Sequence, residues 1–407
     1  MERELVSEPG GASPDGGAPP RLGWPTLAAA GWLLVLEQCS LYLLAAALPL
    51  YLEHLGAARQ RIGIETGAAS LAAVLCTPLV GPLIDRWGPR RLMLLGTAAY
   101  VVAAAGLIAL PYEVAAAACR LTQGIASGLI LPSALTLAPR LVPARRGMIL
   151  GLTGSLNTVA LAIGPPVGLW LYAFGPRQLF LVAGLCALAG LALVKLLPDV
   201  PLHAAQANRV ARGQSHQSWR VAYDRRWTAP LLANALTAAY FGGVVAYLPI
   251  MLAHDHGPSA GIFFTADAIG VILLSAPSGA LVDRAGPRVP QLLGIAVTLG
   301  GLAALFFAPS VLTLILAGAG TGIGAGLFTT AVRVVVATRS AEHNRGTAMA
   351  LSASSGSAGI FVNSALSGLI IGPGGFTGVI VFGALTTLAG LAPVLLDRHA
   401  GPARASS

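Results

Sequence analysis

Hydrophobic and polar positions follow one another along this chain in long blocks. Apolar runs of about 20 residues, the length that an α-helix needs to cross a bilayer, are separated by short polar segments. The ninth and tenth runs meet near Ala308-Pro309-Ser310, which is the least distinct junction. The pattern predicts twelve membrane-spanning helices, at 27–52, 62–84, 91–110, 113–138, 147–171, 176–197, 227–253, 260–282, 289–308, 309–337, 346–371 and 374–396.

The chain also contains an internal repeat. The segment from Gly81 to Arg91 has a counterpart from Gly279 to Arg288, and Gly81 and Gly279 are 198 positions apart. Two homologous six-helix bundles that pack around a pseudo-two-fold axis would enclose a central pathway, which is typical of a transporter. The predicted organisation is a disordered tail (1–26), an N-terminal bundle (27–197), a linker (198–226), a C-terminal bundle (227–396) and a second tail (397–407).

Composition agrees with a membrane protein. The chain has 407 residues, of which 55% are hydrophobic and only 10% are charged, and its mean hydropathy is +0.75. A soluble domain carries about 25% charged residues. So few charges cannot cover a water-facing surface of this size, and most of the surface is therefore expected to face lipid. The predicted fold class is an all-α membrane protein.

The basic residues set the expected orientation. Most of the 25 Lys and Arg residues fall in loops on one side, whereas the other side holds only Arg59, Arg61 and Arg177. By the positive-inside rule, the rich side is cytoplasmic, and both termini lie there in the inner membrane. Topology thus accounts for the net charge of +9, and no nucleic-acid partner is expected. The linker is interpreted as a plain connection, with a regulatory segment as the alternative.

The repeated loops resemble the signature loop of the major facilitator superfamily, Gly-x-Leu-x-Asp-Arg-x-Gly-x-Arg-Arg. In that family the loop between the second and third helices gates the cytoplasmic side. The resemblance implies the twelve-helix major facilitator fold. It also assigns a gating role to Gly81, Asp85, Arg86, Gly88, Arg90, Arg91, Gly279, Asp283, Arg284, Gly286 and Arg288.

Two further stretches resemble motifs of the drug/proton antiporter branch, which contains multidrug efflux proteins. Arg120-Leu121-Thr122-Gln123-Gly124 is similar to the fourth-helix motif Arg-x-x-Gln-Gly. Gly164-Pro165-Pro166-Val167-Gly168 resembles the fifth-helix antiporter motif Gly-Pro-x-x-Gly-Gly, although its last glycine is Leu169 here. The residues that carry this second motif are Gly164, Pro165 and Gly168.

Three charged residues inside predicted helices are the candidates for proton coupling: Glu37, Arg120 and Asp267. A carboxylate near the bilayer centre costs about 2.5–3.5 kcal/mol, so it is rarely kept without a function. In the exporters that this chain resembles, a first-helix Glu stands twelve residues before a Pro, as Glu37 does before Pro49. We hypothesise that Glu37 pairs with Arg120. The alternatives are a purely structural Glu37 and an Asp267 that faces water at the outer end.

Polar residues of the predicted helices are the candidates for lining the substrate cavity, although each could equally serve only to pack helices. They are Gln38, Tyr42, Gln123, Asn157, Asn234, Thr237, Tyr240 and Asn363. The sequence shows no nucleophile–base set, phosphate loop or metal-ligand cluster. We therefore expect neither an enzyme nor a metal, and no cofactor beyond the proton gradient.

The function that these observations predict is secondary active transport. We expect a monomer in the lipid bilayer that exports a small molecule in exchange for protons by alternating access. One alternative is a proton-coupled importer of a nutrient or metabolite. Another is a membrane receptor or scaffold that transports nothing.

Overall fold

The computed structural model describes residues 24–141, 146–198, 225–307, 310–340 and 345–397. The regular secondary structure in these ranges is helical, as expected for a bilayer, where a helix satisfies its own backbone groups. The helices are α1 (Trp24–His54), α2 (Arg59–Trp87), α3 (Pro89–Ala109), α4 (Glu113–Leu141), α5 (Arg146–Ala173), α6 (Pro176–Leu196), α9 (Arg225–Ala238), α10 (Tyr240–His254), α11 (Gly261–Ala285), α12 (Arg288–Ala304), α13 (Val311–Arg339), α14 (Arg345–Ala389) and α15 (Leu391–Leu396).

These helices account for the twelve predicted spans. The seventh span is divided into α9 and α10 at Ala239. The eleventh and twelfth spans run together in α14 and α15, and Gly375, with φ 58° and ψ −164°, interrupts the helical backbone between them. The tenth span begins at Val311, where the Ser310 side chain accepts a hydrogen bond from the amide of Thr313. The prediction of an all-α membrane fold is confirmed.

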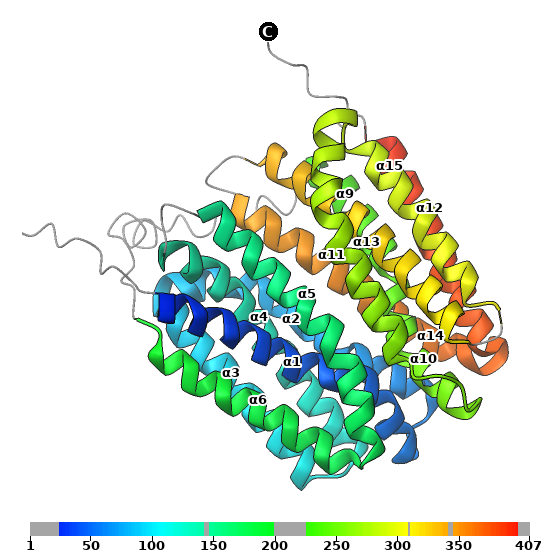
Figure 1. The fold of residues 1–407 in the computed structure, drawn as a ribbon, viewed down its shortest axis with the longest axis horizontal. Coiled ribbons are helices and arrows are strands. Elements are labelled where there is room, and N and C mark those ends of the chain that lie inside the picture. Colours follow the sequence, from blue (N-terminus) through cyan, green and yellow to red (C-terminus); the bar gives the residue numbers. More distant parts are fainter. Residues whose placement is uncertain (1–23, 142–145, 199–224, 308–309, 341–344, 398–407) are drawn as a thin grey trace, which may run out of the picture.

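Figure 1 shows two groups of helices side by side. The N half contains α1 to α6 (blue to green), and the C half contains α9 to α15 (yellow-green to red). We call the end where α1 begins and α15 finishes the terminal end, and the opposite end the far end. The predicted tails and nearly all of the predicted linker lie outside the described residues, apart from short stretches at their edges.

The sequence repeat extends to the packing inside each half. A Cβ added to Gly124 of α4 would overlap the carbonyl oxygen of Ala69 in α2. A Cβ added to Gly322 of α13 would in the same way overlap the carbonyl oxygen of Asp267 in α11. Each of these residues lies 198 positions from its counterpart in the other half. The duplicated glycines therefore let two pseudo-equivalent helix pairs pack closely, α2 with α4 in the N half and α11 with α13 in the C half.

The signature loops turn at their second glycine. Gly88 (φ 81°, ψ 153°) and Gly286 (φ 78°, ψ 167°) occupy a backbone region that is essentially restricted to glycine. Gly81 and Gly279 instead have open space where a Cβ would lie. The Asp85 side chain lies outside the described part of the structure. Four other charged side chains of these loops are exposed, namely Arg86, Arg91, Asp283 and Arg284.

An arginine of each signature loop also binds a backbone carbonyl at the end of the last helix in its half. Arg90 donates through Nη2 to the carbonyl of Lys195 (2.9 Å), and Arg288 donates through Nη2 to the carbonyl of Asp397 (2.6 Å). Arg339 forms an ion pair with the Asp397 carboxylate (2.7 Å). Carbonyls at a helix C-terminus have no partner in their own helix and attract a cation. Arg90 and Arg288 therefore supply hydrogen bonds to these C-terminal carbonyls at the terminal end.

The two halves meet along two seams near the far end. In the α2–α14 seam, Ser364 donates through its hydroxyl to the carbonyl of Gly63 (2.7 Å). In the α5–α11 seam, Pro166 packs against Gly261, where an added Cβ would lie 2.6 Å from the proline Cα. Gly63 and Gly261 are 198 positions apart, and so are Pro166 and Ser364. The seams are therefore pseudo-equivalent contacts of the duplicated fold.

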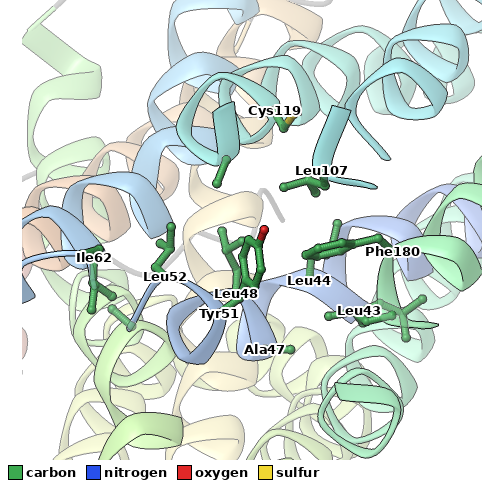
Figure 2. Close-up of a cluster of buried hydrophobic side chains, with 14 of the residues drawn as sticks. Leu43, Leu44, Ala47, Leu48, Tyr51, Leu52, Ile62, Leu107, Cys119 and Phe180 are labelled. Carbon is green, nitrogen blue, oxygen red and sulfur yellow. The ribbon is translucent and has the colours of Figure 1, made fainter. Parts of the chain in front are cut away.

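An apolar cluster fills the space between these seams. Figure 2 shows Leu44, Leu48 and Tyr51 of α1 in this cluster, where the Tyr51 ring meets the Phe180 ring edge to face at a centroid distance of 5.0 Å. The C half contributes Ala246, Tyr247, Ile371 and Val379. Two polar contacts also cross between the halves, from the Tyr247 hydroxyl to the Arg59 carbonyl (2.8 Å) and from His254 to Glu53 (3.0 Å). The far end is thus closed.

The loop glycines give a direct test of the backbone argument. Gly88→Ala and Gly286→Ala should each destabilise the protein by about 1–3 kcal/mol, because alanine rarely adopts their φ and ψ. We expect a lower melting temperature for both variants in a single detergent. Gly81→Ala and Gly279→Ala are the matched controls: both positions are helical with room for a Cβ, so these variants should melt at or slightly above the temperature of the unmodified protein. An equal loss in all four variants would contradict the backbone explanation.

Candidate functional site

A cavity of about 160 Å³ lies in the C half, on the side where α5 of the N half contacts it. Leu161 of α5 comes from the N half, and the other residues that line the cavity come from the C half. They are Thr237, Ala238, Tyr240, Phe241, Asp267, Val271, Ala325, Phe328, Thr329 and Ile360. The lining is predominantly apolar with a few polar groups, which is the composition of a small-molecule site.

Asp267 is the acidic residue of this lining. Its side chain is only 3% exposed, and its Oδ1 accepts a hydrogen bond from the Thr321 hydroxyl at 2.8 Å. Close packing at Gly322 brings α13 against α11, and this places Thr321 beside the carboxyl group. The position of Asp267 near the start of α11 had left open that this residue faces water at the outer end. Its burial shows that it does not.

Aromatic rings form one wall beside Asp267. Tyr240 and Phe241 have ring centroids 6.2 Å apart, and Phe241 and Phe264 have centroids 6.1 Å apart, both edge to face. Thr237, one turn before Phe241, is buried, and its hydroxyl has no hydrogen-bond partner among the described residues. Of the predicted cavity residues, the structure brings Thr237 and Tyr240 together with Asp267.

Glu37 occupies a different place, inside the N half. It is 1% exposed and packs against α6, where a Cβ added to Gly190 would lie 2.6 Å from Oε1. Thr97 of α3 faces the carboxyl group, but its hydroxyl donates to the Met93 carbonyl at 2.8 Å. Neither carboxylate oxygen has a hydrogen-bond partner in the described part of the chain. Glu37 is not among the residues that line the cavity.

Arg120 is buried on α4 and binds within the N half. Its Nη1 donates to Gln123 Oε1 at 2.9 Å, and its Nη2 donates to the Thr66 carbonyl at 3.2 Å. Across the described ranges no ion pair joins Arg120 to Glu37, and Tyr100 of α3 lies near both residues. The hypothesised direct pair is therefore absent from this conformation.

The two predicted asparagines of the C half connect helices. Asn234 donates through Nδ2 to the Ser352 carbonyl (2.8 Å), and Asn363 accepts through Oδ1 from the Gly243 amide (3.0 Å). Neither residue lines the cavity. In the N half, Gln38 is buried with its Oε1 unpartnered. The Asn157 side chain lies outside the described residues.

The glycines of the antiporter motif pack α5 against α1. A Cβ on Gly164 would lie 2.5 Å from the Cβ of Tyr42, and a Cβ on Gly168 would overlap the Leu43 carbonyl. Pro165 lies between these glycines in the middle of α5, where a proline cannot donate a backbone hydrogen bond. The motif therefore produces a close helix contact next to a position where the helical ladder is interrupted.

Glu65 of α2 is a further buried acid, which was not predicted from the sequence. It is 8% exposed and faces Glu113 of α4, which forms an ion pair with Arg61 at 3.2 Å. Its position within the second predicted helix was a signal that could have identified it. Glu65 belongs to the far end of the N half rather than to the cavity.

Comparison with known proteins gives consistent matches. A model of the Major Facilitator Superfamily matches residues 31–265 and 248–407. A chloramphenicol resistance protein of Streptomyces lividans is 30% identical over 287 residues, covering 65% of this chain and 69% of that protein. An uncharacterized MFS-type transporter of Burkholderia pseudomallei is 28% identical over 366 residues, or 86% of each chain. An uncharacterized MFS-type transporter of Mycobacterium tuberculosis matches over 44% of this chain and 32% of its own length.

Solved structures share the fold. A mutant of the nucleoside transporter NupG superposes with a TM-score of 0.74 at 14% identity, covering 92% of this chain and 99% of that one. A POT family transporter in complex with 5-aminolevulinic acid gives a TM-score of 0.73, also at 14% identity, covering 93% of this chain and 98% of that one. At this identity the likeness shows the arrangement of helices alone.

Because the carboxyl of Glu37 has no hydrogen-bond partner among the described residues, we expect it to lower the stability of the protein. A buried polar group without a partner costs about 1–3 kcal/mol, so Glu37→Met, which keeps a similar length, should raise the melting temperature by about 2–4 °C. Glu37→Gln retains a polar group at the same place and should change it little. A melting temperature that falls in Glu37→Met would contradict this account and would indicate a stabilising partner for the carboxyl.

Proposed function

This chain belongs to the Major Facilitator Superfamily and is a membrane transporter; we propose that it exports a small molecule in exchange for protons. The observation that carries the proposal is the buried Asp267 carboxyl, which lines a cavity of the C half that Leu161 of the N half also contacts. Buried acids in transporters mark ion pathways and proton relays, because a charge in the membrane is too costly to retain without a function.

We propose that the Asp267 carboxyl binds a proton and substrate in turn. A protonated carboxyl is neutral and suits the apolar walls formed by Phe241, Val271 and Phe328. An ionised carboxylate needs a donor or a cation, which a substrate can supply. The proton and the substrate cannot occupy the Asp267 carboxyl at the same time. Each of them shifts the conformational equilibrium toward the state that it binds better, so the transport of one is coupled to the transport of the other. A proton that enters the cell releases about 2.3 kcal/mol per 100 mV.

Glu37 is the second candidate for proton coupling. Its place between α1, α3 and α6 separates it from the cavity lining, so it would act by changing the packing of the N half when it gains or loses a proton. Tyr100 lies near both Glu37 and Arg120, and we propose that these three side chains respond together. The alternative of a purely structural Glu37 predicts normal coupling in Glu37→Gln.

Two features favour export. The antiporter motif of α5 is present at Gly164, Pro165 and Gly168, and it forms the close contact with α1. A chloramphenicol resistance protein is among the relatives, which makes chloramphenicol the first compound to test. We propose that the terminal end is cytoplasmic and that the chain acts as a monomer in the inner membrane. The closed far end then corresponds to a conformation that is shut toward the outside.

The proposal predicts a proton flux that depends on Asp267. Proteoliposomes with an acidic lumen and an enclosed pH-sensitive dye should show lumenal alkalinisation when chloramphenicol is added outside, because protons leave in exchange for the drug. Asp267→Asn should lower the initial rate of this signal at least about 10-fold, since an amide cannot take up a proton in this exchange. Radiolabelled chloramphenicol, followed in parallel, reports whether the drug itself still crosses.

The control variant is Glu113→Gln, which removes an acid at the far end outside the cavity and should retain the flux. A full proton flux in Asp267→Asn would refute the role given to this residue. A symporter would behave differently: chloramphenicol loaded into the lumen would leave faster with the outward proton gradient than without it. That result would establish the importer alternative. If none of a panel of drugs and metabolites crosses, the receptor or scaffold alternative is favoured.

A further inference from the structure

A hydrogen bond in the α5–α11 seam joins the halves through a backbone carbonyl. The hydroxyl of Thr265 in α11 donates to the carbonyl oxygen of Ala162 in α5 at 3.1 Å. One turn along each helix, Pro166 packs against Gly261 in the same seam. These contacts lie near the far end, since α11 begins at Gly261 and α5 ends at Ala173.

The Ala162 carbonyl lacks its usual helical donor. In an α-helix the carbonyl of one residue accepts from the amide four residues later, which here would be that of Pro166, and proline has no amide hydrogen. The helix α5 nevertheless continues from Arg146 to Ala173. Because the hydrocarbon core offers no water to such a carbonyl, the Thr265 hydroxyl supplies the missing hydrogen bond from the other half.

The pseudo-equivalent α2–α14 seam differs in this respect. There the Ser364 hydroxyl donates to the Gly63 carbonyl at 2.7 Å. The residue four positions after Gly63 is Gly67, which does have an amide hydrogen within α2. The Gly63 carbonyl therefore keeps a helical donor when the halves separate, whereas the Ala162 carbonyl does not. Loss of the hydroxyl should consequently matter more at Thr265 than at Ser364.

We propose that Thr265 is a positioning residue that holds the far end closed by occupying the carbonyl that Pro166 leaves free. The bond breaks whenever the halves part at the far end, so it biases the equilibrium between far-end-closed and far-end-open states. The inference rests on the alternating-access mechanism proposed above. It does not depend on which molecule is transported or on proton coupling.

The test measures the far-end distance directly in lipid nanodiscs, without substrate or proton gradient. Spin labels on ketone-bearing amino acids at positions 112 and 312 leave the four native cysteines in place, and Tyr112 and Leu312 are 64% and 63% exposed in opposite halves. Double electron–electron resonance then gives the closed and open populations. Thr265→Val should lower the closed-to-open ratio about fivefold, because an unpartnered buried carbonyl costs more than an exchanged hydrogen bond.

A double-variant cycle isolates the carbonyl. Pro166→Ala supplies the missing amide hydrogen to Ala162, so Thr265→Val in that background should lower the ratio by no more than about twofold. Comparing the two variants within each background cancels any effect of Pro166→Ala on its contact with Gly261. A monodisperse profile on size exclusion confirms that each variant is folded before its distances are interpreted.

Three further variants complete the test. Thr265→Ser keeps the hydroxyl and should preserve the ratio. Ser364→Ala removes the bond to the carbonyl that keeps its helical donor and should lower the ratio by about twofold or less. Thr122→Val removes a hydroxyl that bonds within α4, to the Ala118 carbonyl, and should change nothing. The proposal is overturned if Thr265→Val leaves the ratio unchanged, or if its effect is as large with Ala at position 166.

Discussion

The hydrocarbon core of a bilayer offers no water to an unpaired backbone group, so each interruption of a helix must be matched by a donor or acceptor from elsewhere in the protein. The described helices meet this requirement with side chains of neighbouring helices. Arg90 and Arg288 bind carbonyls at the ends of the last helix in each half. Thr265 binds a carbonyl inside α5, in the half of that helix nearer the far end. The first two contacts lie within a half, whereas the third crosses between halves and must break when they separate.

The two halves of the chain share their close helix contacts but differ in their buried charged side chains. Gly124 and Gly322 make the same close approach in the two halves, against Ala69 and Asp267 respectively. At the position where the N half has a methyl group, the C half therefore has a carboxyl group. Glu37 of the N half lies against Gly190, and Thr237 lies against Gly390 in the same way, so the counterpart of this buried acid, 200 positions later, is a threonine. The shared scaffold places helices, and single substitutions on it create the charged sites.

The sequence predicted the twelve spans and the repeat because both depend on residue type and spacing alone. It also predicted that Asp267, Thr237 and Tyr240 belong to a functional site, and the structure brings these three together. It did not predict that Glu37 faces α3 and α6, because the direction of a side chain on a helix hydrophobic all round is set by packing. Leu161 and Phe328 line the cavity as ordinary apolar residues, so no signal in the sequence separated them from the core.

The position of Asp267 relative to the α5–α11 seam links the cavity to the closure of the far end. Thr265 and Asp267 are two residues apart on α11, so their side chains point about 200° apart around the helix. Thr265 reaches α5 of the opposite half, while Asp267 reaches Thr321 of α13 in its own half. A tilt of α11 that loosens one contact therefore also displaces the other. A change of charge or occupant at Asp267 acts on the same rigid helix that closes the far end, which gives proton or substrate binding a short mechanical route to the seam.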